Sequence, residues 1–144
     1  MQSVQHWDAM NAITPELYCT DLATSLAFYC GPLGFTVLYD RPEDGFAFLR
    51  RESAELMLEQ LAMPGRRWIT GPLERPFGRG LNLQIAAADA RALYAMVLAA
   101  GHTPHLPLEE RWYRLDTGEV GNLQFIVADP DGYLLRFATD LGRR

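Results

Sequence analysis

The sequence lacks features that mark several large protein classes. Only two of its 144 residues are cysteines, Cys19 and Cys30, and they do not form a Cys-x-x-Cys pair. This disfavours redox chemistry, and we expect two free thiols in a reducing compartment. The sequence also contains no glycine-rich phosphate loop and no Gly-x-Ser-x-Gly element. These absences argue against a P-loop nucleotide hydrolase and an α/β-hydrolase.

Long apolar runs and an excess of basic residues are missing as well. No apolar segment approaches the roughly 18 residues that a membrane helix needs. The chain carries 13 basic and 18 acidic residues, a net charge of −5, whereas a nucleic-acid partner requires a basic face. The polar leader at residues 1–11 has no apolar signal core. We therefore expect a cytoplasmic protein that binds neither membranes nor nucleic acid.

What the sequence does contain is a weak internal repeat, at an offset of about 67 residues. Residues 17–35 and 83–102 both read as a strand, an aspartate at a helix start, a helix and a glycine stop. A module of this kind leaves one sheet face open, so two modules must pack together, and the cleft between them is the natural ligand site. We expect one domain, 1–144, with modules at 13–61 and 80–140 and a connector at 62–79.

Hydrophobic periodicity and turn residues predict the elements of both modules. Asp21 or Thr24 caps a first helix that runs to about Leu33, and Asp89 caps a second helix over residues 90–100. Strands of the first module are expected at 13–19, 35–40, 45–50 and 54–61. Strands of the second module are expected at 81–86, 103–107, 110–116, 122–128 and 133–138. The tetrapeptide Asp129–Gly132 predicts a tight turn before the last strand.

Two segments carry a resemblance to a known group of proteins. The first is Asp21-Leu22, Ser25-Leu26-Ala27-Phe28-Tyr29 and Leu33-Gly34-Phe35; the second is the run from Phe125 to Phe137 around the turn. They resemble the vicinal oxygen chelate superfamily, which includes glyoxalase I, extradiol dioxygenases, and fosfomycin- and bleomycin-resistance proteins. The resemblance implies an α+β fold of two βαβββ modules that form a curved mixed sheet around a cleft. It also implies a homodimer with a small-molecule ligand.

The superfamily fold does not by itself determine the chemistry. In its metal enzymes, four side chains hold a divalent ion, and the matching positions here are Thr14, Leu58, Asn82 and Arg136. These residue types cannot build a tight site for zinc, nickel, manganese or iron. The resemblance therefore implies a metal-free binding protein without a cofactor, of which bleomycin-resistance proteins are the best known. Sequestration of an antibiotic is the concrete form of this hypothesis.

Alternation along the strands predicts which side chains line the ligand site. The expected ligand-binding residues are Thr14, Glu16, Tyr18, Leu58, Asn82, Gln84, Trp112 and Arg136, with Leu56 and Gln60 beside them. Arg136 either binds a carboxylate or phosphate or pairs with Glu16 as a structural bridge. Trp112 or Tyr113 is expected to stack on a flat ligand at the rim of the cleft.

Two enzymatic alternatives remain open, and the catalytic residues are unknown. The first is a metal-dependent lyase, isomerase or dioxygenase whose divalent ion is held by shifted ligands. Its ligands would come from Glu16, Glu59, His102, His105 and Glu110. The second is an enzyme without metal, in which Glu16 acts as base and Arg136 stabilises an oxyanion.

Overall fold

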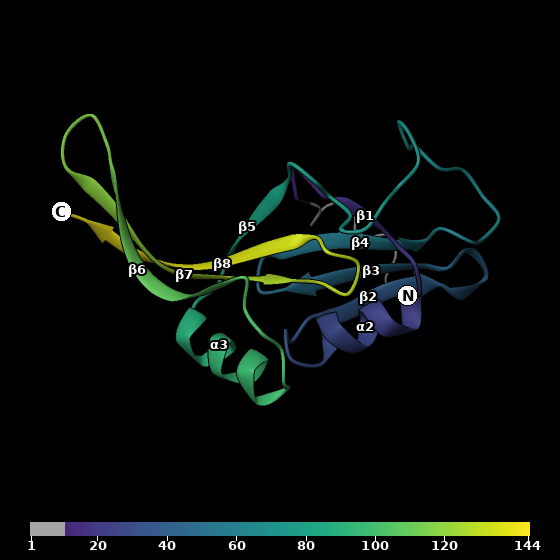
Figure 1. Ribbon diagram of the computed structural model, residues 1–144, viewed down its shortest axis with the longest axis horizontal. Coiled ribbons are helices and arrows are strands. Elements are labelled where there is room, and N and C mark those ends of the chain that lie inside the picture. The colour runs from purple at the N-terminus through teal and green to yellow at the C-terminus, as the bar shows by residue number, and fades with distance from the viewer. Residues whose placement is uncertain (1–10) are drawn as a thin grey trace.

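The chain folds into two modules that share one order of elements. The computed structural model describes residues 11–144, so the polar leader expected at 1–11 lies outside it except for Asn11. The elements of the first module are β1 (Glu16–Cys19), α2 (Leu22–Cys30), β2 (Thr36–Arg41), the 3₁₀ turn η1 (Pro42–Asp44), β3 (Phe46–Arg51) and β4 (Ala54–Gln60). Those of the second module are β5 (Asn82–Ala86), α3 (Ala90–Ala99), β6 (Leu106–Arg114), β7 (Glu119–Ala128) and β8 (Leu134–Arg143). The expected α+β fold is confirmed (Figure 1).

Each module contributes one four-stranded mixed sheet. The strand orders are β1-β4-β3-β2 and β5-β8-β7-β6, so the topology repeats as the sequence predicts. In each sheet the first strand pairs in parallel with the last, and the other pairs are antiparallel. The two strands expected at 103–107 and 110–116 are one strand, β6, because its pairing with β7 continues across an irregularity between Leu106 and Glu109.

Aspartate side chains start both helices, as the sequence predicts. Asp21 accepts a hydrogen bond from the backbone N–H of Thr24 at 3.1 Å, and Asp89 accepts one from Ala92 at 3.0 Å. Helix α2 ends at Cys30, three residues before the expected Leu33. Both helices lie on one side of the sheets, which leaves the opposite sheet faces open (Figure 1).

Leu58 lies in the apolar core of the first module. The register of the parallel pair places it beside Leu17, and its side chain is fully buried with Phe28 and Tyr29 of α2. The prediction that Leu58 faces the cleft was therefore wrong. Alternation along β4 puts Met57 and Glu59 on the open face instead.

The turn between β7 and β8 joins the two modules. The hydroxyl of Tyr29 donates to Asp129 at 2.8 Å in a buried contact. The backbone N–H and the hydroxyl of Thr20 donate to Asp131 at 3.1 and 2.6 Å. Arg75, in the connector, donates to the same carboxylate at 2.8 Å. The Asp-Pro-Asp-Gly sequence therefore forms a tight turn and also fixes the end of β1 and helix α2 to the second module.

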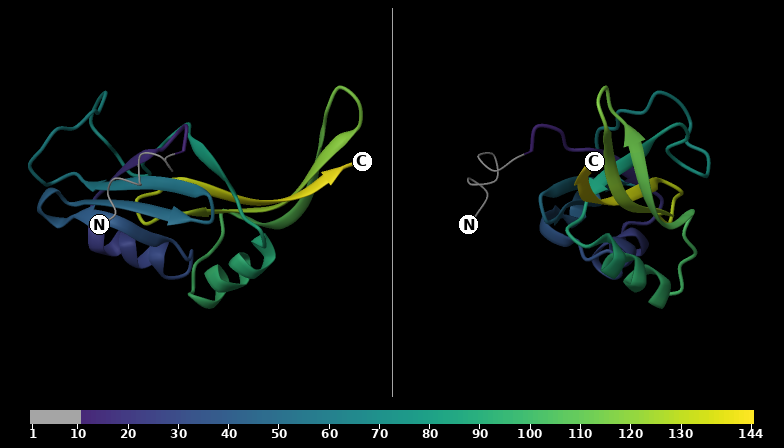
Figure 2. Two further views of the ribbon diagram at one scale, coloured as in Figure 1. Left: turned by 180° about the vertical axis from the view of Figure 1, so that it is seen from behind. Right: turned by 90° about the vertical axis from the view of Figure 1, so that its left-hand side faces the viewer.

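The distal part of the second sheet extends beyond the helices. Figure 2 shows the β6–β7 hairpin and the end of β8 as an arm that leaves the body of the molecule. No helix within residues 11–144 is long and apolar enough to cross a membrane.

Candidate ligand-binding site

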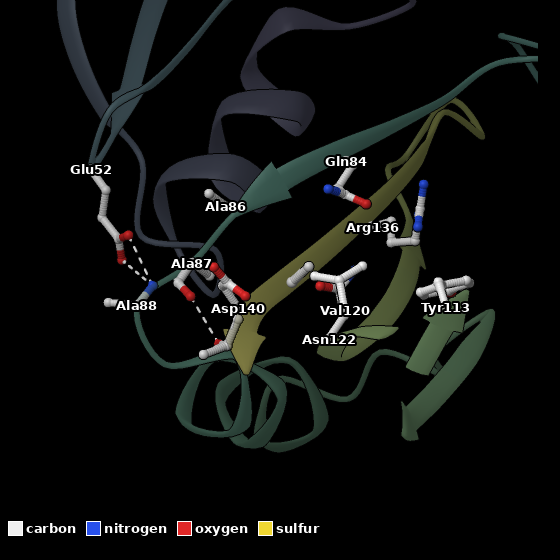
Figure 3. Close-up of a pocket in the computed structure, with 12 residues that line it drawn as sticks. Glu52, Gln84, Ala86, Ala87, Ala88, Tyr113, Val120, Asn122, Arg136 and Asp140 are labelled. Carbon is white, nitrogen blue, oxygen red and sulfur yellow. Dashed lines mark hydrogen bonds between the residues drawn. The ribbon is translucent and has the colours of Figure 1, made fainter. Parts of the chain in front are cut away.

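A hollow of about 800 Å³ lies on the open face of the second sheet. Its walls come from all four strands of that sheet, and Glu52 of the first module contributes to the rim (Figure 3). The lining residues are Glu52, Gln84, Ala86, Ala87, Ala88, Tyr113, Val120, Asn122, Arg136, Ala138, Thr139 and Asp140. Small side chains form much of the surface, and a few polar groups converge on it, as is typical of sites for small molecules.

Side chains alternate between the two faces of the sheet along β5 and β8, and every second residue faces the hollow. Gln84 lies beside Arg136, and Ala86 lies beside Ala138, on the open face. The residues between them point the other way, so Ile85 and its neighbours in β8 are buried in the core under α3. The apolar residues pack the sheet against α3, and the residues that alternate with them line the hollow.

Arg136 carries a positive charge that has no acidic partner in the part of the chain that the structure describes. Its Nε donates to the side-chain oxygen of Asn82 at 3.3 Å. Among residues 11–144 it forms no ion pair, and the expected structural bridge to Glu16 is not formed. Gln84 and Arg136 lie together on one side of the hollow, and Glu52 lies on the opposite side (Figure 3). The amide of Asn82 thus positions a guanidinium whose terminal nitrogens remain available.

Tyr113 is the aromatic residue of the hollow, and its position is fixed by a buried amide. Gln124 Nε2 donates to the Tyr113 hydroxyl at 2.7 Å and to Glu109 at 3.0 Å. Because that hydroxyl oxygen accepts this bond, its own proton is free to be donated into the hollow. The Tyr113 side chain is 37% exposed.

Trp112 points to the opposite face of the β6–β7 hairpin. Its indole N–H donates to Glu110 at 2.8 Å, and the guanidinium of Arg144 lies 4.1 Å from its ring. The ring packs over Gly121, where a Cβ atom would come within 2.7 Å of it. The expectation that Trp112 lines the site is therefore wrong for this hollow, and its neighbour Tyr113 takes that place.

The open face of the first sheet carries a separate polar cluster. Glu16 lies there near Glu59, and burial followed by the charge of Glu59 raises the pKa of Glu16. Arg67 lies 3.4 Å from Glu59, and the Tyr18 hydroxyl accepts the backbone N–H of Trp68 at 3.0 Å. None of these residues lines the hollow of the second sheet.

The predicted single pocket is therefore divided between two sheet faces. Thr14, which precedes β1, and Glu16 and Tyr18 belong to the first module; Gln84 and Arg136 line the hollow of the second. Asn82 contacts Arg136 but does not itself line the hollow. Within one chain the structure does not bring the two groups together.

Sequence reasoning missed two polar residues of β7. Asn122 lines the hollow, and its side-chain nitrogen lies 3.5 Å from the oxygen of Gln124, which orients Tyr113. Their alternation with apolar Leu123 and Phe125 is a signal that could have identified them. Glu52 was unpredictable because it reaches the rim from the other module.

Of the shifted metal ligands of the enzymatic alternative, Glu16 and Glu59 lie together and the other three lie elsewhere. The His102 ring packs edge-on against Phe28, with ring centroids 4.9 Å apart, and Glu110 is bound to Trp112. The backbone N–H of His105 donates to the carbonyl of Ile126 in the sheet. In the part of the chain that the structure describes, no three residues among His, Cys, Asp and Glu form a group able to hold a metal ion.

Known proteins resemble this chain over nearly its whole length. Residues 9–137 match the model of the Glyoxalase/Bleomycin resistance protein/Dioxygenase superfamily. The chain belongs to this superfamily. Bleomycin resistance proteins of Geobacillus stearothermophilus and Staphylococcus aureus are each 30% identical to it over 132 residues, which cover 85% of this chain and 92% of the relative.

Several solved structures share the fold. A virulence protein from Salmonella typhimurium is 21% identical, with a TM-score of 0.67 over 90% of this chain and 97% of its own. TioX from Micromonospora sp. ML1 is 20% identical, with a TM-score of 0.66 over 91% of this chain and 100% of its own. A lactoylglutathione lyase from Agrobacterium tumefaciens is 19% identical, with a TM-score of 0.58 over 90% and 94% of the two chains. At these identities the likeness establishes the fold alone.

Proposed function

We propose that this superfamily member binds a small molecule on the open face of its second sheet, as a homodimer and without a metal ion. The observation that carries the proposal is the hollow itself. It combines a surface of small side chains with converging polar groups on Gln84, Asn122, Tyr113 and Arg136. Such a site binds through shape and hydrogen bonds, and it contains no nucleophile paired with a base.

The donor groups of the hollow do not fit the divalent ion of the superfamily's metal enzymes. Arg136 has a fixed positive charge and no lone pair to donate. Gln84 and Asn122 offer only amide oxygens, which are weak ligands for zinc and iron. Among residues 11–144, the two carboxylates of the lining, Glu52 and Asp140, have no third His, Cys, Asp or Glu beside them to complete a metal site. Their chemistry supports binding without a metal, and we derive no step through one.

Sequestration of an antibiotic is the concrete form of the proposal. It is supported by the 30% identity to proteins named for bleomycin resistance. Retention of the compound in a tight complex would be sufficient for such a role, and no bond need be broken.

The test is a calorimetric titration with bleomycin-type antibiotics and other flat compounds. Ala86→Phe fills the hollow from an exposed strand position, and Ala95→Phe places the same ring on the exposed surface of α3. The proposal predicts binding below millimolar that Ala86→Phe abolishes and Ala95→Phe leaves unchanged. Failure of every compound to bind below millimolar would refute the antibiotic version. Equal binding by both variants would refute the assigned site.

The homodimer is part of the proposal, and a distinct measurement tests it. In such a dimer, the polar cluster on the first module of one chain would face the hollow on the second module of its partner. Ile13, next to β1, is 82% exposed and is an apolar residue available for such a contact. Sedimentation equilibrium should give twice the chain mass of 16.2 kDa, and a single-chain mass at every concentration would contradict this part.

One observation favours an enzyme without metal as the second candidate. Burial and the neighbouring Glu59 raise the pKa of Glu16, which suits a general base better than an ordinary exposed glutamate. If the proposed dimer brings the polar cluster against the hollow and Glu16 is such a base, Glu16→Gln should abolish turnover of a bound compound while it leaves the affinity unchanged. A variant that turns over the compound at the normal rate would eliminate this candidate.

A further inference from the structure

The one cation that lines the hollow, Arg136, has no acidic partner among residues 11–144. Of the two acidic groups in the lining, Glu52 pairs with Arg51 at 2.8 Å, and Asp140 accepts the backbone N–H of Gly142 at 2.8 Å, a neutral partner that does not compensate the carboxylate. Arg136 has only the neutral amide of Asn82 on its Nε. Within residues 11–144 nothing accepts a hydrogen bond from its two terminal nitrogens. The terminal nitrogens of Arg136 are therefore available to a ligand.

The surroundings of Arg136 offer several hydrogen-bond donors to a bound anion. The side chain is partly buried on a concave sheet face, and its Nε donates to Asn82 in a solvent-exposed hydrogen bond of 3.3 Å. Its terminal nitrogens form a planar fork, which matches the two oxygens of a carboxylate or phosphate group. The amide of Gln84 lies beside it, and the Tyr113 hydroxyl can donate a further hydrogen bond from β6.

The rest of the hollow limits what the anionic group can be attached to. Ala86 and Ala138 lie side by side on β5 and β8, next to the pair Gln84 and Arg136. Side chains this small leave room for a flat body to lie against the sheet. Tyr113 offers the edge or face of its ring to such a body.

We propose that the ligand of this site carries a carboxylate or phosphate-type oxyanion, bound by the guanidinium of Arg136, on a flat and largely apolar body. The inference rests on the proposed function, because it assigns a ligand class to the same hollow. It makes Arg136 a residue that determines specificity. Two oxygens of the ligand take the place of water on the terminal nitrogens, and its body covers the alanines.

The test compares three probes that share one ring. Benzoate and phenyl phosphate carry an oxyanion, and benzamide is the neutral counterpart of benzoate. Each is titrated at millimolar concentration into ¹⁵N-labelled protein, and amide shifts of β5 and β8 report the hollow. We expect both or one of the anions to bind at least about tenfold more tightly than benzamide, because hydrogen bonds to charged groups are the stronger ones. Tighter binding of benzoate would identify a carboxylate as the preferred group, and tighter binding of phenyl phosphate would identify a phosphate.

Two arginine variants make the result specific. Arg136→Gln keeps a donor amide and removes the charge, whereas Arg91→Gln removes a charge from the exposed surface of α3. The inference predicts a loss of about tenfold to a hundredfold in anion affinity for Arg136→Gln alone, and weaker binding by the wild type at high salt. The amide spectrum of each variant shows whether it is folded.

Every other outcome overturns the inference. If benzamide and benzoate bind equally to the wild type and to Arg136→Gln, the hollow binds small molecules but does not select an anion, and the proposed function stands. If Arg91→Gln weakens the anions as much as Arg136→Gln, the effect is one of net charge only. If no probe moves an amide of β5 or β8, both the anion site and the hollow as a ligand site fail.

Discussion

Removing the Tyr29 hydroxyl should weaken the contact between the two modules. The Tyr29 side chain is fully buried, and its O–H donates to the buried Asp129 at 2.8 Å. Burial and the adjacent carboxylate raise the pKa of Tyr29 well above the ordinary tyrosine value, so the phenol remains a donor at all physiological pH values. Tyr29→Phe keeps the ring and deletes only this bond.

The cost follows from the charge of the acceptor. A hydrogen bond to an ionised group contributes about 1.5–3 kcal/mol, so Tyr29→Phe should lower the free energy of unfolding by about 2 kcal/mol. For a chain of this size that corresponds to a fall in Tm of about 4–8 °C. Urea denaturation followed by tryptophan fluorescence measures the change at neutral pH.

A matched control distinguishes this bond from the general effect of losing a hydroxyl. Tyr94 of α3 packs on Phe125, and its hydroxyl has no hydrogen bond among residues 11–144. Tyr94→Phe should therefore change stability by less than about 0.5 kcal/mol. An equally small effect of Tyr29→Phe would refute the assigned role of the Tyr29–Asp129 bond.

Three further predictions concern the same region and the hairpin arm. Burial raises the pKa of Asp129 above its ordinary value of 3.8, so the folded state binds this proton more tightly than the unfolded state does. The resulting stabilisation is present at low pH and is lost as pH rises through the folded pKa. In urea titrations, the stability of the wild type relative to Asp129→Asn should therefore fall as pH rises through that pKa. Asp131→Ala should cost about 2 kcal/mol, because the backbone N–H of Thr20 loses its acceptor, as calorimetry can measure. Gly121→Ala should displace the Trp112 ring and shift its fluorescence, at a cost of about 1 kcal/mol.

Each of these predictions has a contrary result. A stability difference between wild type and Asp129→Asn that is constant with pH would contradict the raised pKa. An unchanged Tm for Asp131→Ala would show that the turn does not fix the modules. Gly71→Ala introduces a methyl group into open space and serves as the control for Gly121→Ala; equal effects of the two would contradict the packing over Trp112.

Local signals in the sequence were sufficient to predict most of the fold. Asp21 and Asp89 start their helices because a carboxylate can accept the unpaired N–H groups of a first turn, and both are visible from sequence alone. Topology could be anticipated because the repeat imposes the same strand order on both halves. Segment 103–116 was divided incorrectly because Pro104 and Pro107 suggested a break that strand β6 bridges.

The faces of the strands were harder to assign. Leu58 was predicted to lie on the open face, although its partner in the sheet, Leu17, is apolar and lies on the helix side. The neighbouring residue Glu59 is the one that lies on the open face. Trp112 and Tyr113 are adjacent, so the choice between them depends on the irregularity between Leu106 and Glu109, and the sequence does not reveal that irregularity. A shift of one residue in the register of a strand moves each of its side chains to the other face of the sheet.

Contacts between distant segments lay beyond sequence reasoning. Thr20 and Asp131 are 111 positions apart, and nothing local indicates that the turn docks on β1. The same holds for Glu52, which reaches the hollow from the first module. The division of the expected site residues between two sheet faces has this origin, because alternation assigns a face within a sheet and not the position of one sheet relative to the other.

The most direct test of ligand binding without metal is one calorimetric series on chelator-treated protein. The protein is titrated with the best compound of the panel, first without metal and again after addition of nickel, zinc, manganese or iron(II). The account predicts the same affinity and heat in every titration. Binding or turnover that appears only when a metal is present would contradict it and would place this chain among the metal-dependent enzymes of its superfamily.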